Sequence, residues 1–98
     1  MTKHRKKRIK KDHTVPPVFA FDEWLVITES LALSPRQAQV LGLVIQSHKD
    51  QEIVDSLNIG KSTVRTHLIE TKKRLSAKDR VGLAYRVFVA FREVVEPK

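Results

Sequence analysis

The sequence predicts an all-α fold, with four helices over residues 34–93 preceded by an apolar segment and a basic tail. Three observations support this prediction. Apolar side chains recur every three or four residues, the spacing that lines one side of a helix. Helix-capping residues stand before three of these apolar stretches. In the middle of the chain, a short helical segment, a tight turn and a longer helical segment follow one another.

The composition limits the chain to one domain and indicates a polyanionic partner. The chain has 98 residues, of which 41% are hydrophobic and 31% charged. There are 19 Lys+Arg and 11 Asp+Glu residues, for a net charge of +8. This balance favours nucleic acid first and an anionic membrane second. No apolar run approaches the roughly 18–20 residues of a membrane span. We therefore expect no membrane partner, and a cytoplasmic location with the nucleoid.

The N-terminal tail, residues 1–17, carries most of the excess charge. Residues 1–13 hold seven basic residues and one acid, a net +6. Such a density of like charges predicts disorder, and Pro16-Pro17 prevents a helix from continuing. The tail is either a solvated end of the chain or a flexible arm that binds DNA phosphates.

Residues 18–33 form a strongly apolar extension with three of the six aromatic residues. Asp22 is a candidate cap for a short helix from Glu23 to about Leu31. The apolar pattern does not decide which side of this helix faces inward. The segment is either an extra element packed on the core or a docking or dimerisation surface built around Trp24.

The next helix has a clear start at Ser34. Its hydroxyl can accept from the amide of Gln37 while the Gln37 side chain reaches back, and Pro35 takes the first helical position. The helix is expected to run to about Ser47. Its core-facing residues are Val40, Leu41, Val44 and Ile45.

A short helix and a tight turn follow. Asp50 is the expected cap, and Ile53, Val54 and Leu57 are expected to turn inward. The turn is Asn58-Ile59-Gly60. Asn58 tolerates a positive φ there, and Gly60 is expected to free the backbone before the next helix.

The third helix spans Lys61 to Leu75, with Val64, Leu68, Thr71 and Leu75 at helical spacing toward the core. This order of helix, turn and longer helix is that of a helix-turn-helix. Asp79 is expected to cap the last helix. Its inward residues are predicted to be Ala84, Val87, Phe88 and Phe91, and residues 94–98 form a C-terminal tail.

The outer side of helix 61–75 is the predicted DNA-binding site, because its early turns would meet bases and its later turns the backbone. The residues that we expect to bind DNA are Lys61, Ser62, Thr63, Val64, Arg65, Thr66, His67, Ile69, Lys72, Lys73 and Arg74. Arg65 is the best base reader, since its planar fork fits guanine. Thr66 and Ile69 offer methyl groups that suit thymine.

The remaining predicted contacts go to phosphates. Ser62, Thr63 and the free amides of the first turn suit a phosphate. Lys61, Lys72, Lys73 and Arg74 are further candidates, which position the protein without specifying sequence. Each cation could instead belong to a solvated helix side. His67 is either a satisfied structural histidine or a phosphate donor.

These residues resemble the LuxR-type (also GerE- or NarL-type) helix-turn-helix family of bacterial transcription regulators, from about Leu33 to Phe88. The segment LSPRQAQVL is similar to the family's opening L-T-x-R-E-x-x-V-L. The segment QEIVDSLNIGKSTVRTHL resembles its E-I-A-x-x-L-x-I-S-x-x-T-V-x-x-H block. Arg74-Leu75 and the later Lys78-Asp79-Arg80 resemble its K-L-x-x-x-x-R ending.

The resemblance implies a four-helix DNA-binding domain that binds as a dimer, with the fourth helix at the dimer interface. The family's recognition-helix contacts carry over to Thr63, Val64, Arg65, Thr66 and His67. Only 33 residues precede the resemblance, too few for the receiver or ligand-binding domain of most members. We therefore expect a stand-alone DNA-binding domain, regulated by its concentration, by a partner protein or through residues 18–33.

Several positions depart from the family pattern. Gln37 replaces Glu, Gly60 replaces a capping Ser, and Thr71 replaces an apolar residue. Ser47 replaces Gly and Val54 replaces Ala, which predicts a wider corner between the first two helices. Ile69 stands at a position where the family often has a polar residue that contacts a base. The DNA sequences that family members bind therefore do not predict the sequence that this chain binds.

The sequence lacks catalytic signatures, and we expect no enzyme, cofactor or metal. GKST at 60–63 lacks the upstream glycine of a phosphate-binding loop. The chain has no cysteine, and its four histidines lie far apart. The leading hypothesis is a sequence-specific regulator of transcription that binds double-stranded DNA as a homodimer. The alternatives are a module that binds RNA polymerase, a sigma factor or another regulator, and a nonspecific DNA-compacting protein.

Overall fold

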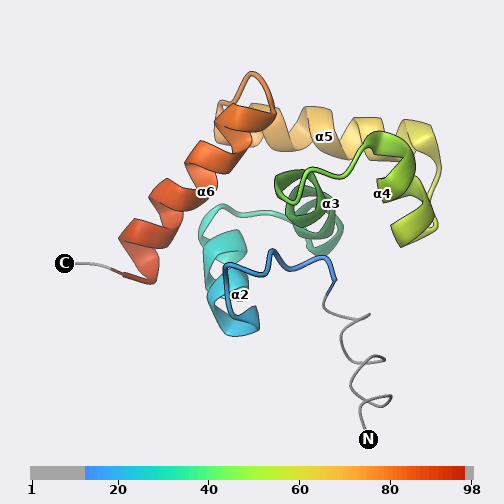
Figure 1. Cartoon of the computed structure of the whole chain (residues 1–98). Coiled ribbons are helices and arrows are strands. Elements are labelled where there is room, and N and C mark those ends of the chain that lie inside the picture. The colour runs from blue at the N-terminus through green and yellow to red at the C-terminus, as the bar shows by residue number, and fades with distance from the viewer. Residues whose placement is uncertain (1–12, 97–98) are drawn as a thin grey trace, which may run out of the picture.

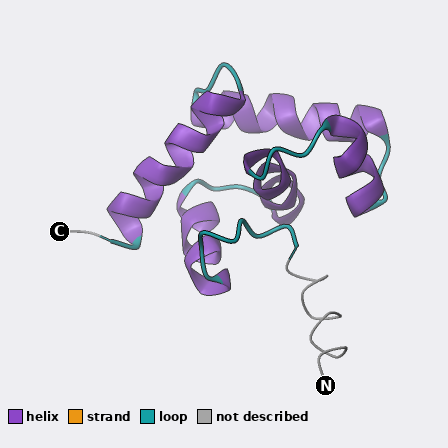
Figure 2. Cartoon of the chain, viewed as in Figure 1, coloured by secondary structure: helices purple, strands orange, loops and turns teal. Residues whose placement is uncertain are grey.

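Five helices form within residues 13–96, the part of the chain that the computed structural model describes. They are α2 (Phe21–Ser30), α3 (Pro35–Ile45), α4 (Asp50–Leu57), α5 (Lys61–Leu75) and α6 (Arg80–Val94) (Figure 1). No strand occurs within residues 13–96, so the all-α prediction is confirmed for them (Figure 2). Most of the predicted disordered tail, residues 1–12, lies outside the described residues, as do residues 97–98.

Helix α3 forms the centre of the molecule, because α4, α5 and α6 all pack against it (Figure 1). Its residues Val40, Leu41 and Leu43 are completely shielded from solvent. Leu43 was not among the predicted core residues, whereas Ile45, which was, is only partly buried. A helix that is covered on several sides buries more than the single stripe that a surface helix needs.

Two of the predicted helix starts are confirmed. The amide of Gln37 donates to Oγ of Ser34 (3.1 Å), and the amide of Ser34 donates to Oε1 of Gln37 (3.0 Å). These two bonds complete the predicted capping box of α3. At the start of α6, the carboxylate of Asp79 accepts a hydrogen bond from the amide of Gly82 (2.8 Å).

Helix α4 starts differently from the prediction, because Asp50 is its first residue and not its cap. Lys49 takes the cap position, and its amide donates to Oε1 of Glu52 (2.8 Å). Glu52 thus supplies the N3 half of a capping box, while no side chain at the cap position accepts from the first-turn amides. Asp50 is therefore available to pair with Arg80 of α6.

The predicted short helix in residues 18–33 is present as α2, although Asp22 does not cap it. Ala20 precedes the helix, and its amide donates to Oε1 of Glu23 (2.8 Å). The helix packs against α6. Of the two alternatives for this segment, the extra element packed on the core is confirmed.

Trp24 lies inside the molecule, so the predicted docking surface built around it is wrong. Only 3% of its surface is exposed, and its ring stacks on Phe19 with the centroids 5.8 Å apart. Ile27, on the same side of α2, is completely buried. Phe21, the first residue of α2, points outward and is 53% exposed.

Residues 13–17 are packed on the core, which shortens the predicted disordered tail at its C-terminal end. Thr14 and Pro16 are both buried. The side-chain amide of Gln46 in α3 donates to the carbonyl oxygen of His13 (2.9 Å). Disorder was predicted for all of residues 1–17 because residues 1–11 are so strongly positive. The structure of residues 13–17 depends instead on their contacts with the core, which the sequence pattern does not reveal.

Four helix ends are made by non-glycine residues in the left-handed region. Their φ angles are 58° for Ala32, 72° for Ser47, 56° for Asn58 and 55° for Ser76. The predicted positive φ of Asn58 is thereby confirmed. Ser47 takes the conformation that a glycine would take at a helix end, so its substitution for the family's Gly does not by itself require a wider corner.

Helix α6 buries a different stripe from the predicted one. Leu83, Val87 and Ala90 face the core. Of the predicted residues only Val87 is fully buried, while Phe88 remains 43% exposed and touches the core through the ring of Phe19, with the centroids 5.5 Å apart. The helix ends at Val94, within one residue of the predicted domain boundary.

Candidate nucleic-acid interface

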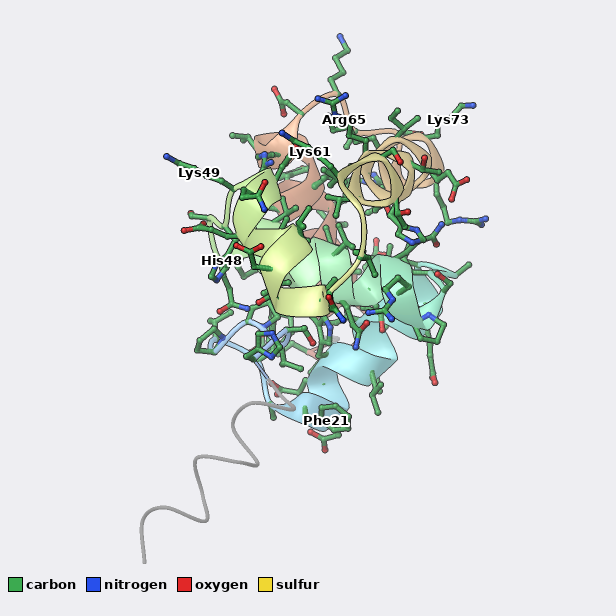
Figure 3. The ribbon with its side chains drawn as sticks, turned by 90° about the vertical axis from the view of Figure 1, so that its right-hand side faces the viewer. Phe21, His48, Lys49, Lys61, Arg65 and Lys73 are labelled. Carbon is green, nitrogen blue, oxygen red and sulfur yellow. The ribbon has the colours of Figure 1, made fainter. Side chains whose placement is uncertain are left out.

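Helix α5 is held against α3 and α4 by one buried side. Val64, Leu68, Thr71 and Leu75 form that side, as the sequence predicted. Because these residues fix the rotation of the helix about its axis, the opposite side is presented to solvent. Figure 3 shows Lys61, Arg65 and Lys73 projecting from the end of the molecule where α5 lies.

The start of α5 leaves backbone amides without a side-chain cap. Gly60 is the cap residue and has an ordinary extended conformation, with φ −72° and ψ 160°. The expectation that Gly60 supplies unusual backbone freedom is therefore wrong. Because no side chain accepts from the first-turn amides, they are free to bind an anion.

The structure brings most of the predicted site residues together on the outer side of α5. The exposed ones are Lys61, Ser62, Thr63, Arg65, Thr66, Ile69, Lys73 and Arg74, and Lys72 is partly exposed. Within residues 13–96, no carboxylate or carbonyl oxygen pairs with any of the five cations of this helix. Glu70 is the one acidic residue of α5, so the helix carries a net charge of +4.

Val64 is the exception among the predicted DNA-binding residues. Its side chain is completely buried in the core, so it cannot touch a base or a phosphate. The core position that periodicity predicted for Val64 is the correct one, and the contact carried over from the family is not available to its side chain. Val64 instead orients Arg65 and Thr66, which follow it on the exposed side.

His67 is partly buried and has one unsatisfied ring nitrogen. Its Nδ1 is buried and has no hydrogen-bond partner within residues 13–96, so the ring is not a fully satisfied structural histidine. Its backbone oxygen accepts from the hydroxyl of Thr71 (2.7 Å). This local bond satisfies Thr71, which explains how a polar residue replaces the family's apolar one in the core.

Gln37 joins the start of α3 to α5. Besides capping α3, its side-chain amide donates to Oε1 of Glu70 (3.1 Å). A glutamate at position 37, which the family usually has, would bring two carboxylates together at this distance and repel Glu70. The neutral amide therefore keeps the cap and adds a contact to α5.

Arg80 was not among the predicted site residues, although it closes the motif that resembles the family's ending. Its guanidinium donates to the Asp50 carboxylate (2.7 Å) and to the His48 carbonyl oxygen (2.8 Å). These contacts tie the start of α6 to the start of α4. Arg80 and Asp50 also line a hollow beside α5, together with Arg65 and Lys72. The hollow therefore combines three cations with one acid.

Helix α6 presents an apolar row to solvent. Val81 is 78% exposed and Tyr85 66% exposed, and the half-exposed Phe88 continues the row at helical spacing. Single exposed apolar residues are common on proteins, but a row along one helix marks an interaction surface.

Two other kinds of site are not found in the described part of the chain. No group of three or more His, Cys, Asp or Glu residues there could hold a metal ion. None of the helices between residues 13 and 96 is long and apolar enough to cross a membrane.

These features define the class of the protein. A short helix, a tight turn and a helix with one buried and one basic side make up a DNA-binding helix-turn-helix, supported here by α3 and α6. The family model of bacterial regulatory proteins of the luxR family matches residues 31–87, and the chain belongs to this family. The family consists of regulatory proteins and is not a family of enzymes.

One curated relative gives a second comparison. The chain is 35% identical over 51 residues to the transcriptional regulatory protein MctR of Rhizobium johnstonii. The match covers 52% of this chain and 24% of that protein, so the chain spans about a quarter of the relative's length. No solved structure matches the chain significantly.

Proposed function

We propose that this protein regulates transcription by inserting α5 into the major groove of specific double-stranded DNA sequences, as a homodimer. The observation that carries the proposal is the division of α5 into a buried apolar side and an exposed cationic side. The major groove is about 12 Å wide and admits one α-helix. The membership of the luxR family and the name of the relative support a role in regulation.

The early turns of α5 read the bases in this proposal. Arg65 is fully available, because no acceptor among residues 13–96 holds its guanidinium. It would donate two hydrogen bonds to O6 and N7 of a guanine, a contact worth about 1–3 kcal/mol of discrimination. Thr66 and Ile69 lie exposed on the same helix and would pack methyl groups on thymine.

Contacts with DNA phosphates would lie on both sides of Arg65 along α5. Lys61, Ser62 and Thr63 lie at the uncapped start of α5 beside its free amides. Lys72, Lys73 and Arg74 lie in its last turn. Nε2 of His67 would be a further donor in the tautomer that carries the proton on that atom, while Nδ1 of the ring is buried. These contacts position α5 and carry little sequence information.

The exposed row of α6 is the proposed dimer contact. Val81, Tyr85 and Phe88 would pack against the same residues of a second copy, since contacts in a two-fold dimer are self-complementary. Two copies of α5 would then enter successive major grooves. The two half-sites should lie about 10–10.5 bp apart.

The basic N-terminal residues would add affinity without specificity. Residues 1–13 carry a net +6, which favours counterion release on binding to any DNA. In a bacterial cell such a protein would reside in the cytoplasm with the nucleoid.

The test is selection of bound sequences from random duplex DNA at physiological salt, with and without residues 1–12, which carry the whole charge of the basic tail. The proposal predicts a motif with dyad symmetry that survives removal of these residues, at lower affinity. Binding to all sequences with a steep salt dependence would favour a nonspecific DNA-compacting protein and contradict the proposal.

A further inference from the structure

The outer side of α2 is more apolar than a helix packed on a core requires. Trp24 and Ile27 already supply the buried anchor. On the solvent side, Phe21 is 53% exposed and Leu25, one turn later, is 42% exposed. The outer side of a surface helix is usually polar, so these two residues indicate a second contact.

Phe21 stands between two grooves. The first groove runs between α2 and the start of α3, where Leu25, Leu33 and Pro35 contribute apolar walls. The second lies on the other side of Phe21 and is lined by the segment before α2, including Val15 and Phe19. Two side chains of one partner segment could thus sit on either side of the Phe21 ring.

The negative charge of α2 indicates the charge of a partner that would bind there. The helix contains three acids, Asp22, Glu23 and Glu29, and no basic residue. Glu29 lines the first groove, and its carboxylate has no hydrogen bond or ion pair with any other residue between 13 and 96. Gln39 also lines this groove, and its Oε1 accepts a hydrogen bond from the guanidinium of Arg36 (3.0 Å). Acidic charge around an apolar centre repels DNA and attracts a basic segment.

The grooves are placed so that they remain accessible during DNA binding. Figure 3 shows Phe21 at the end of the molecule opposite to Arg65, Lys61 and Lys73. Helix α3 lies between these two ends, as the same view shows. A partner seated on Phe21 would therefore not compete with DNA bound along α5.

From these observations we propose that the surface formed by Phe21, Leu25, Glu29 and the two grooves docks a segment of another protein. The segment carries apolar residues, which enter the grooves, and Lys or Arg, which pair with Glu29. A second copy of this chain is disfavoured, because a two-fold contact through this surface would bring its acidic helix against itself. The inference does not depend on which DNA sequence α5 reads.

The experiment is selection of short random peptides displayed against the full chain, with excess duplex DNA present to occupy α5 and the basic tail. The enriched peptides should combine apolar residues with Lys or Arg. We expect them to bind the Phe21→Ser variant about tenfold more weakly, because this variant removes the central apolar contact. The Glu29→Lys variant should weaken them several-fold at low salt and less at high salt.

The Val94→Ser variant is the matched control, because Val94 is an exposed apolar residue of α6 that lines neither groove. It should leave peptide binding unchanged. Thermal unfolding and DNA affinity of each variant establish that the domain is intact. Since Glu29 is exposed, Glu29→Lys tests the surface even if Phe21→Ser is poorly folded.

Three outcomes would overturn the docking surface. These are enrichment of no peptide, enrichment of acidic peptides, and enrichment of peptides that bind Phe21→Ser and Glu29→Lys as tightly as the parent chain. A loss of self-association in Phe21→Ser would show that a second copy occupies the surface, which would also contradict the proposal. None of these results would alter the DNA-binding proposal, whose readout is the motif selected by α5.

Discussion

At the scale of single residues, the helix ends show where the chain accepts unfavourable backbone conformations. Ser47 follows α3 with φ 72°, a region in which a side chain costs roughly 1–2 kcal/mol. Glycine avoids most of this cost, although it loses more conformational freedom on folding. Ser47→Gly should therefore raise the free energy of unfolding by about 0.5–1 kcal/mol.

Urea unfolding followed by circular dichroism measures this change. Ser30→Gly is the matched control, because Ser30 lies within α2 and its hydroxyl donates to the carbonyl oxygen of Ile27 (2.7 Å). That variant should lower stability by about 0.5–1 kcal/mol. Equal effects of the two substitutions would contradict the role assigned to the left-handed conformation.

Gly60 offers a second stabilising substitution. A Cβ atom at this position would meet nothing closer than Oγ1 of Thr63 at 3.9 Å. The backbone is extended, so a serine fits and its hydroxyl can accept from the first-turn amides of α5. Gly60→Ser should stabilise the fold by about 0.5 kcal/mol in the same unfolding measurement.

Gly42→Ala is the contrasting variant. A Cβ atom at Gly42 would overlap the carbonyl oxygen of Thr14, which belongs to the segment packed over α3. We expect this variant to lose stability and to release residues 13–17 from the core, as increased proteolysis there would reveal. A stable Gly42→Ala protein would contradict the close packing of this segment.

At the scale of the elements, the sequence predicts well where local chemistry decides the structure. The Ser34–Gln37 capping box and the bounds of α5 were predicted correctly, because a few neighbouring residues determine them. Asp50 was assigned to the cap position but is the first residue of α4, which begins one residue earlier than predicted, after Lys49. The bond from the Lys49 amide to Glu52 favours this earlier start, and a preference for polar caps does not reveal it.

The orientation of α2 was the main element-level question that the sequence left open. Its inner side is fixed by contacts with α6, which is distant in the sequence, and with Phe19, which lies before the helix and outside its periodic pattern. Burial of Trp24 on this side turned a predicted surface into part of the core. For the same reason the sequence could not identify the exposure of Phe21.

The position of Trp24 gives a prediction at this scale. Trp24→Ala removes a ring that is 3% exposed and should cost about 3–5 kcal/mol, enough to unfold a small domain. Phe21→Ala, at the outer side of the same helix, should cost less than about 1 kcal/mol. Differential scanning calorimetry of the two variants checks the difference, and similar losses would contradict the orientation of α2.

At the scale of the whole molecule, charge and apolar surface are divided among separate faces. The outer side of α5 is basic, α2 is acidic and apolar, and α6 exposes an apolar row. The exposed basic side of α5 was largely predictable, because five residues of this helix are cations and its buried residues recur at helical spacing. The position of Arg80 beside Arg65 could not be predicted from the sequence, because it depends on how α6 returns toward α4.

The apolar row of α6 predicts how the protein associates. Tyr85→Glu should weaken the proposed dimer, because the row would then bring two carboxylates into the contact. Sedimentation velocity should show that the variant is a monomer and that the parent chain dimerises at the same concentration. The variant should keep its affinity for a single half-site and lose affinity for the full dyad. Unchanged association would assign the dimer contact to another surface.

The most direct test of α5 as the sequence-reading helix compares Arg65→Ala with Lys73→Ala on every single-base-pair variant of the selected site, at fixed salt. Both residues are exposed on α5, so neither change should disturb the core. Arg65→Ala should remove the preference at one base pair, worth about 1–3 kcal/mol. Lys73→Ala should weaken binding to all sites alike and reduce the salt slope by about 1. Equal losses on cognate and random DNA for both variants would contradict base reading by Arg65.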